Sequence, residues 1–233
     1  MMRRPFNGNY VMLIFLIFMI FNAIRNNPYS TFGEWLVDTL LKLPAIVIGI
    51  TIHEHAHART AWKLGDATPR AQGRVTLNPA SHIDPFGLIA LIFVGFGWGK
   101  PVQVNPYAFR KNRRRANLLV AVAGVATNCV AAFLCTALLF VVTNGVLGAI
   151  VYYIVYFNIV LMIFNLLPVP PLDGFGILTE VFNLRRMPWY DTLYSYGFFI
   201  LLFLIVIGAT RLILGPGVIL IRDAFISVWA LIL

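Results

Sequence analysis

Residues 43–62 read LPAIVIGITIHEHAHARTAW, a run of twenty residues in which most side chains are apolar. As an α-helix such a run rises about 30 Å, which is the thickness of the hydrocarbon core of a bilayer. Lys42 and Lys63 flank it, and a group of histidines with one glutamate lies inside it. The run therefore predicts a membrane-spanning helix that carries a polar group.

The composition of the whole chain supports the same class. Of its 233 residues, 60% are hydrophobic and 12% are charged, whereas soluble domains carry about 45–50% apolar and about 25% charged residues. This composition excludes a soluble enzyme, a disordered protein and a disulfide-rich secreted scaffold. The two cysteines, Cys129 and Cys135, lie in one apolar run, so we expect small residues of a membrane helix rather than a disulfide or a zinc site.

The net charge of +9 does not indicate nucleic acid as a partner. A nucleic-acid interface would show a basic face interleaved with aromatic side chains. Here the arginines flank the apolar runs instead, which is typical of cytoplasmic loops in membrane proteins. We expect membrane lipid as a partner, and the basic run at residues 110–115 is suited to contact anionic lipid. The sequence gives no indication of oligomeric state.

The apolar runs predict an all-α, polytopic bundle of about six membrane spans. The expected spans are Tyr10–Ile24, Leu43–Trp62, Asn117–Thr143, Val146–Leu167, Leu193–Leu214 and Val218–Leu233. The apolar run Phe86–Trp98 is shorter and contains three glycines, so we expect a re-entrant or interfacial element there. All of these runs are assigned to one domain, residues 1–233, with its core at about residues 43–186.

Basic clusters predict the topology. The clusters are Arg3 with Arg4, residues 63–115, and Arg185 with Arg186. They can share one side only if an even number of spans separates them, and the assignment places two spans in each interval. We therefore expect a multi-pass protein of a prokaryotic plasma membrane with its amino terminus and its active-site entrance in the cytoplasm. The first span is expected to be a retained anchor, because no small-residue cleavage site follows it.

The polar group inside residues 43–62 has the spacing of a zinc site. His53 and His57 are four residues apart and so share one face of a helix, with Glu54 beside that face. In this H-E-x-x-H arrangement two imidazoles bind zinc and the glutamate handles protons. His55 points to another face, where we expect an ordinary polar neighbour. The alternative is a buried polar group that neighbouring helices satisfy without metal.

Catalytic zinc commonly takes three protein ligands, and Asp173 is the candidate for the third. It lies in residues 165–174, NLLPVPPLDG, where prolines interrupt a helix. His53 is ten residues before Lys63 and Asp173 twelve before Arg185, so both can lie at a similar depth from one face. The alternative for Asp173 is a capping role after a proline turn. For Asp66 and Asp84 we expect structural roles in the polar loop.

Residues 53–57 and 165–174 together resemble the site-2 protease family of intramembrane zinc metalloproteases. Further stretches similar to that family are GDATP at 65–69, GRVTLNP at 73–79, HIDP at 82–85 and GWGKPV at 97–102. The last two are typical of its compact members, which lack accessory domains. The resemblance covers about residues 45–186.

The resemblance implies an endopeptidase that hydrolyses transmembrane-helix substrates. It assigns His53, His57 and Asp173 as ligands of one Zn²⁺ per chain and Glu54 as the catalytic acid and base. It also suggests that Asn165 positions or polarises the substrate carbonyl. One departure is visible: the family often has Gly-Pro-x-x-Asn, whereas this chain has Val125 after Gly124. The change should alter a local kink and not the ligands, and we expect Asn128 to be structural.

Two other functions fit parts of the pattern. A metal transporter or channel also places histidines and acids inside the membrane, but transport favours several sites along a path and often inverted repeats. This sequence concentrates its ligands in one place and shows no repeat. A catalytically silent scaffold that keeps zinc for folding is the third possibility, and the intact Glu54 argues against it.

Overall fold

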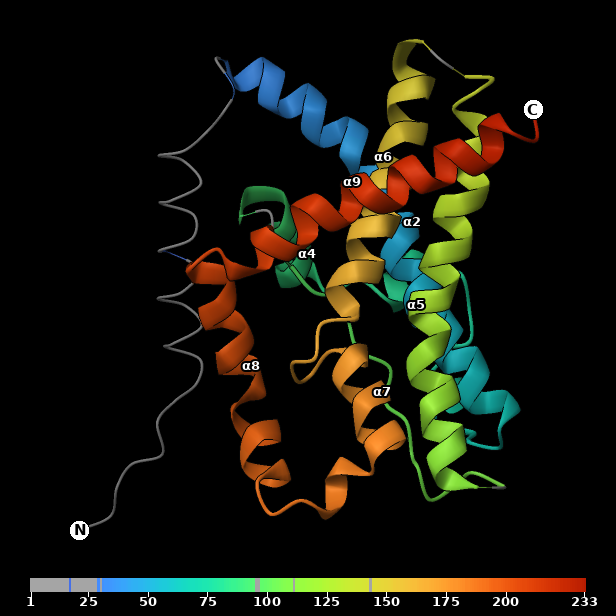
Figure 1. The fold of residues 1–233 in the computed structure, drawn as a ribbon, viewed down its shortest axis with the longest axis vertical. Helices are drawn as coiled ribbons and strands as arrows, with labels where there is room; N and C mark the ends of the chain where they lie inside the picture. The colour runs from blue at the N-terminus through green and yellow to red at the C-terminus, as the bar shows by residue number, and fades with distance from the viewer. Residues whose placement is uncertain (1–16, 18–28, 30, 95–96, 111, 143) are drawn as a thin grey trace.

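The computed structural model describes residues 17, 29, 31–94, 97–110, 112–142 and 144–233. The predicted first span, Tyr10–Ile24, lies outside these residues except for Ile17. The predicted all-α fold is confirmed (Figure 1). Among the described residues, the β-structure consists of one isolated antiparallel bridge between Ile83 and Gly99.

In the part of the chain that the structure describes, four helices are long and apolar enough to cross a membrane, namely α2, α5, α6 and α9. The helices in chain order are α2 (Phe32–Lys63), α3 (Thr68–Ala71), the 3₁₀ helix η1 (Pro79–Ser81), α4 (Pro85–Val94), α5 (Arg113–Leu138), α6 (Gly145–Asn165), α7 (Asp173–Phe182), the 3₁₀ helix η2 (Leu184–Arg186), α8 (Tyr190–Val206) and α9 (Ala209–Ala230). Helix α8 has 17 residues and is shorter than these four.

Helices α2, α5 and α6 pack together, and α9 runs obliquely across α6 and α5 (Figure 1). The buried apolar core lies between α5, α6 and α9 and consists of Val125, Ala132, Val155, Ile159, Met162, Ile163 and Val218. Helix α9 is held further by Trp229, whose Nε1 donates to the Phe133 carbonyl at 2.8 Å. The three-helix unit of α2, α5 and α6 is therefore the framework on which the site is built.

Capping residues explain why two helices begin earlier than the apolar runs suggest. Thr31 caps α2, since its Oγ1 accepts from the Glu34 N–H at 3.2 Å, and the helix includes Pro44. Asn112 caps α5, because its Oδ1 accepts from the Arg115 N–H at 3.2 Å. A polar oxygen that satisfies a free N–H at the first turn stabilises a helix start. Both helices therefore begin in polar sequence.

The predicted break between the last two helices was wrong. We expected it at Gly215-Pro216-Gly217, but α9 runs continuously through Pro216. The chain breaks instead at Gly208, whose φ of 77° is left-handed and suits glycine. Proline is tolerated inside membrane helices because neighbouring groups can satisfy the backbone atoms that it frees.

The short apolar element is α4, which starts after Asp84. The Oδ1 atom of Asp84 accepts from the Gly87 N–H at 2.8 Å and so caps the helix. With 10 residues, α4 rises only about 15 Å. This length agrees with the expected re-entrant or interfacial element.

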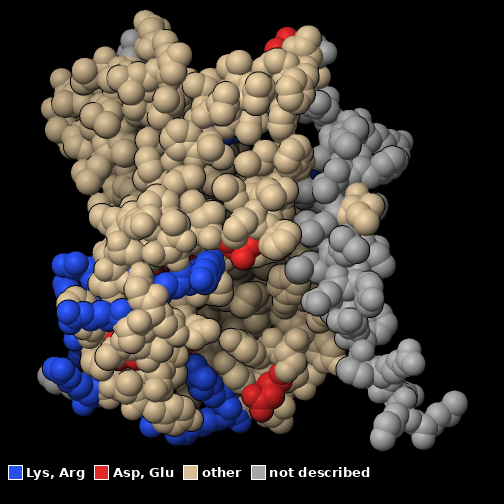
Figure 2. Space-filling model, turned by 180° about the vertical axis from the view of Figure 1, so that it is seen from behind, with Lys and Arg blue, Asp and Glu red and all other residues tan. Residues whose placement is uncertain are grey.

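The described basic clusters lie at one end of the molecule. Arg114 of α5 donates to the carbonyls of Glu180 and Val181 at the end of α7. The Glu180 carboxylate in turn accepts from Arg185 and from Asn117, each at 3.0 Å. Burial alone would lower the pKa of Arg185, but its hydrogen bond to Glu180 raises it. Figure 2 shows Lys and Arg gathered over one end of the face that it draws.

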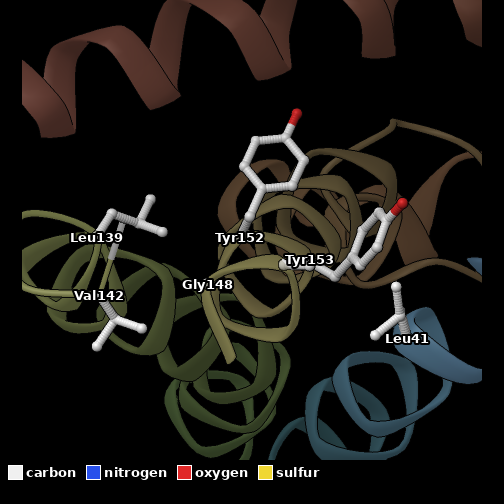
Figure 3. Close-up of a pocket in the computed structure, with 7 residues that line it drawn as sticks. Leu41, Leu139, Val142, Gly148, Tyr152 and Tyr153 are labelled. Atoms are coloured by element: carbon white, nitrogen blue, oxygen red, sulfur yellow. The ribbon is translucent and has the colours of Figure 1, made fainter. Parts of the chain in front are cut away.

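A cavity of about 430 Å³ lies near the first turns of α6, at the end of that helix away from Asn165 (Figure 3). Its lining comes from α2, from α6 and from the residues that follow α5, and consists of Leu41, Leu139, Val142, Gly148, Ala149, Tyr152 and Tyr153. Leu41 is twelve residues before His53, about 18 Å along α2. The cavity is therefore separate from the histidine pair.

Candidate metal centre

The structure brings His53, His57 and Asp173 together. The two histidines share one face of α2, and Asp173 is the first residue of α7. The Nε2 atoms of His53 and His57 are 3.0 Å apart. Asp173 Oδ2 lies 3.2 Å from each of them. Segments more than a hundred residues apart in sequence thus bring together three atoms that could hold a metal ion.

These distances fit zinc. Bonds of about 2.0–2.1 Å in a tetrahedron place the ligand atoms about 3.3 Å apart. The three observed separations are close to that value, so the atoms can occupy three corners of a tetrahedral site. Asp173 Oδ2 is buried and, apart from the two imidazoles, has no hydrogen-bond donor among the described residues. Zinc would satisfy this oxygen.

Gly124 of α5 lies beside the Nε2 atoms of His53 and His57. A Cβ atom at this position would lie 2.5 Å from His57 Nε2 and 2.7 Å from His53 Nε2. Those distances are shorter than any ordinary contact and only about 0.5 Å longer than a zinc–nitrogen bond. A side chain at residue 124 would therefore compete with a metal ion for the same space.

Each histidine is held through its other ring nitrogen. His57 Nδ1 donates to the Val120 carbonyl at 2.7 Å, and His53 Nδ1 lies 2.5 Å from Asn128 Oδ1. Such partners orient metal-binding imidazoles and direct the opposite nitrogen to the metal. We expected Asn128 to be structural, and that interpretation missed its contact with His53. Val125, the departure from the family pattern, is a buried core residue.

Glu54 follows His53 and contacts the loop that precedes α5. Its Oε2 accepts from the Val102 N–H at 3.2 Å. The backbone just before Val102 is fixed by Arg74, which is buried and donates to the carbonyls of Lys100 and Pro101 at 2.6 and 2.7 Å. The motifs at 73–79 and 97–102 thus meet beside Glu54. We did not identify Arg74 as a functional residue from the sequence, although its motif was the available signal.

The other polar residues singled out in the sequence form hydrogen bonds with backbone groups. His55 Nδ1 donates to the Thr76 carbonyl at 2.9 Å, in agreement with the expected polar neighbour. Asp66 is fully buried and accepts from the N–H groups of Thr68 and Asn105 at 2.9 and 2.7 Å. Asn165 is the last residue of α6, and its Nδ2 donates to the Leu161 carbonyl at 2.9 Å. Its role toward a substrate stays a prediction.

Comparison with known proteins agrees with the geometry. Residues 141–208, which include Asp173, match Peptidase family M50. The "Putative zinc metalloprotease YwhC" of Bacillus subtilis is 36% identical over 197 residues, which are 80% of this chain and 90% of that protein.

More distant relatives carry a similar name. The "Putative zinc metalloprotease Rip2" of Mycolicibacterium smegmatis is 28% identical over 188 residues, 78% of this chain and 71% of that protein. Its namesake in Mycobacterium tuberculosis H37Rv is 33% identical over 141 residues, 57% of this chain and 53% of that protein. No solved structure matches the chain.

The similarity to the Bacillus relative spans most of both chains. It confirms the expected family and the expected cofactor, Zn²⁺, and the apolar helices agree with an integral membrane protein. The chain belongs to peptidase family M50, the site-2 protease family of zinc metalloproteases.

Proposed function

We propose that this metalloprotease cleaves transmembrane-helix substrates, with zinc held by His53, His57 and Asp173 and with Glu54 as acid and base. The observation that carries the proposal is the set of three ligand atoms separated by 3.0–3.2 Å. Two of these atoms belong to α2, a helix long and apolar enough to span a membrane, and the third belongs to the first residue of α7. Endopeptidase chemistry would therefore take place at the level of the bilayer.

Glu54 is the proton carrier in this proposal. Zinc at this centre would polarise a substrate carbonyl and lower the pKa of a water molecule. Glu54 would accept the proton of the attacking water and deliver it to the leaving amide nitrogen. The Val102 N–H holds one carboxylate oxygen of Glu54, which limits the positions that the other oxygen can take. Asn165 would position the substrate carbonyl.

The substrate must expose a peptide carbonyl to be cleaved. In a helix each carbonyl accepts a hydrogen bond and side chains surround the backbone. A membrane helix must therefore unwind locally before hydrolysis. Residues of low helix propensity, such as Gly, Pro, Asn or Ser near the bond, should favour cleavage.

The orientation proposed for the molecule follows from its basic end. We place the end formed by Arg114, Arg185 and Lys63 in the cytoplasm of a prokaryotic cell, with the entrance to the site on the same side. Cytoplasmic loops collect Lys and Arg because these residues resist translocation.

Metal transport is the alternative function. It would use several sites along a path through the bundle. In the part of the chain that the structure describes, one group of His, Cys, Asp and Glu side chains could hold a metal, and it is His53, His57 and Asp173. A single closely spaced group favours catalysis.

The test compares the wild type with Glu54→Gln in detergent. Zinc per chain is measured, together with cleavage of a peptide that contains a membrane helix. The variant keeps the side-chain volume but cannot carry the proton, so we expect one zinc per chain and a rate lower by about 10²–10⁴-fold.

His55→Gln is the matched control, because His55 bonds to the Thr76 carbonyl, and it should keep both zinc and activity. Wild-type turnover in Glu54→Gln would exclude the proposed mechanism. Zinc flux into proteoliposomes that is unaffected by Glu54→Gln, without peptide cleavage, would support transport instead.

A further inference from the structure

A chain of buried polar side chains leads from the metal centre through three helices. His53 Nδ1 on α2 lies 2.5 Å from Asn128 Oδ1 on α5. Asn128 Nδ2 donates to Asn158 Oδ1 on α6 at 2.7 Å. Asn158 Nδ2 donates to the Ile154 carbonyl at 2.8 Å. Asn128 and Asn158 are both fully buried, and no motif in the sequence includes Asn158.

The Ile154 carbonyl, at the end of this row of hydrogen bonds, determines which group donates and which accepts in each of them. The Ile154 carbonyl can only accept, so it must face the amide nitrogen of Asn158. The oxygen of Asn158 therefore faces Asn128 and accepts from its nitrogen. The reverse orientation would place an oxygen against the carbonyl and two amide nitrogens against each other.

The same reasoning determines the orientation of the Asn128 amide and then which ring nitrogen of His53 carries a proton. The nitrogen of Asn128 also donates to the Gly49 carbonyl at 3.2 Å, so both of its acceptors lie on one side. Its oxygen is left facing His53 Nδ1, and an oxygen of an amide can only accept. His53 must therefore carry a proton on Nδ1 and direct Nε2 to the cluster with Asp173.

We infer that Asn158 is a positioning residue of the metal centre. It fixes the orientation of Asn128, which in turn holds His53 in the ring orientation and tautomer that metal binding needs. This inference rests on the proposed role of His53 as a zinc ligand. Partners beyond the ligands typically change metal affinity by about 10–100-fold.

The competing explanation is that the two asparagines only join helices. Polar side chains inside membrane bundles often form such interhelical hydrogen bonds. That role would affect the stability of the bundle and not the metal affinity. Zinc affinity and the absorption spectrum of the Co²⁺-substituted protein therefore separate the two explanations, since the spectrum responds to ligand geometry.

The experiment uses the full chain with Asn158→Ala, which removes the oxygen without adding bulk. Zinc affinity is measured by competition with a chelator, and we expect it to fall about tenfold with a changed Co²⁺ spectrum. Thr136→Ala is the matched control. Thr136 is also fully buried, and its hydroxyl donates to the Ala132 carbonyl at 2.8 Å, so it takes no part in the hydrogen bonds that link His53 to Asn158. It should leave both readouts unchanged.

Two further variants test whether Asn158 acts on the metal centre through Asn128. Asn158→Asp has the same size, and as the protonated acid, the form that full burial favours, it keeps an oxygen facing Asn128 and donates its O–H to the Ile154 carbonyl, so it should restore most of the affinity. The effects of Asn128→Ala and Asn158→Ala should not add, because either one breaks the same chain. Wild-type affinity and spectrum in Asn158→Ala, or fully additive losses, would overturn the inference. Failure of the wild type to bind zinc would instead refute the proposed function.

Discussion

Gly124 is the residue whose replacement tests the metal position most directly. A methyl group there would lie 2.5 Å from His57 Nε2, where the imidazole must move or the metal cannot enter. We expect Gly124→Ala to bind zinc at least tenfold more weakly, as for the loss of a partner of the metal ligands. Zinc content after dialysis against a weak chelator measures the effect.

Gly176 provides the control for that substitution. A Cβ there would lie 3.5 Å from the Ala121 side chain, an ordinary contact. Gly176→Ala should keep zinc at the wild-type level. Full zinc occupancy in Gly124→Ala would show that the metal lies elsewhere.

Asp173 is the ligand candidate that joins two distant segments. Asp173→Ala leaves two imidazoles, and Asp173→Asn replaces a carboxylate with a neutral amide that binds zinc poorly. We expect both variants to lose most of their zinc and their activity. Asp84→Ala serves as the comparison, because Asp84 caps α4, and it should retain metal. Retained zinc in Asp173→Ala together with loss from Asp84→Ala would reassign the ligand.

The sequence predicted part of this centre for a clear reason. His53 and His57 are local partners, since four residues are about one helical turn. Asp173 needed the proline context and the family resemblance, because nothing local links it to α2. Asn158 had no signal at all, as an asparagine in an apolar run acquires a role only when α2, α5 and α6 are packed. These site residues stay predictions until the variants are measured.

At the scale of elements, the contact between α5 and α7 holds the helix that carries Asp173. Arg114 donates to two carbonyls at the last turn of α7, which have no partner within the helix. We expect Arg114→Met to destabilise the protein by about 1–3 kcal/mol, since these carbonyls lose their donor. Unfolding in SDS measures the change.

Arg113→Met is the neighbouring comparison. Arg113 lies over the ring of Tyr107, 4.4 Å from its centroid, a contact that contributes about 0.5–1 kcal/mol at an exposed site. Arg113→Met should therefore lower the free energy of unfolding by less than Arg114→Met does. Equal stability of Arg114→Met and wild type would show that α7 is held by its apolar contacts alone.

The elements themselves were largely predictable from apolar runs, and the errors are at their ends. The run at Val146–Leu167 nearly coincides with α6, Gly145–Asn165. The last two helices differ more, because Gly215-Pro216-Gly217 is a strong break signal in water but not among packed membrane helices. Caps at Thr31 and Asn112 extended two other helices into polar sequence.

At the scale of the whole molecule, the gathering of basic residues at one end predicts the orientation in the membrane. Single cysteines at Arg70 and Arg186, in a background that lacks Cys129 and Cys135, should react with an impermeant reagent only after the cells are opened. A cysteine at Leu147, exposed in the first turn of α6, should react in intact cells. The opposite pattern would reverse the proposed topology.

The position of His53 within α2 also sets the length of the reaction products. It precedes Lys63, the end of α2, by ten residues, about 15 Å along the helix. An extended substrate covers that distance with about five residues, at about 3.3 Å each. The number of residues between the scissile bond and the cytoplasmic edge of the membrane should therefore be nearly constant from one substrate to another. Two residues inserted between the scissile bond and the membrane edge should move the cut by two residues, and mass spectrometry of the fragments would show it.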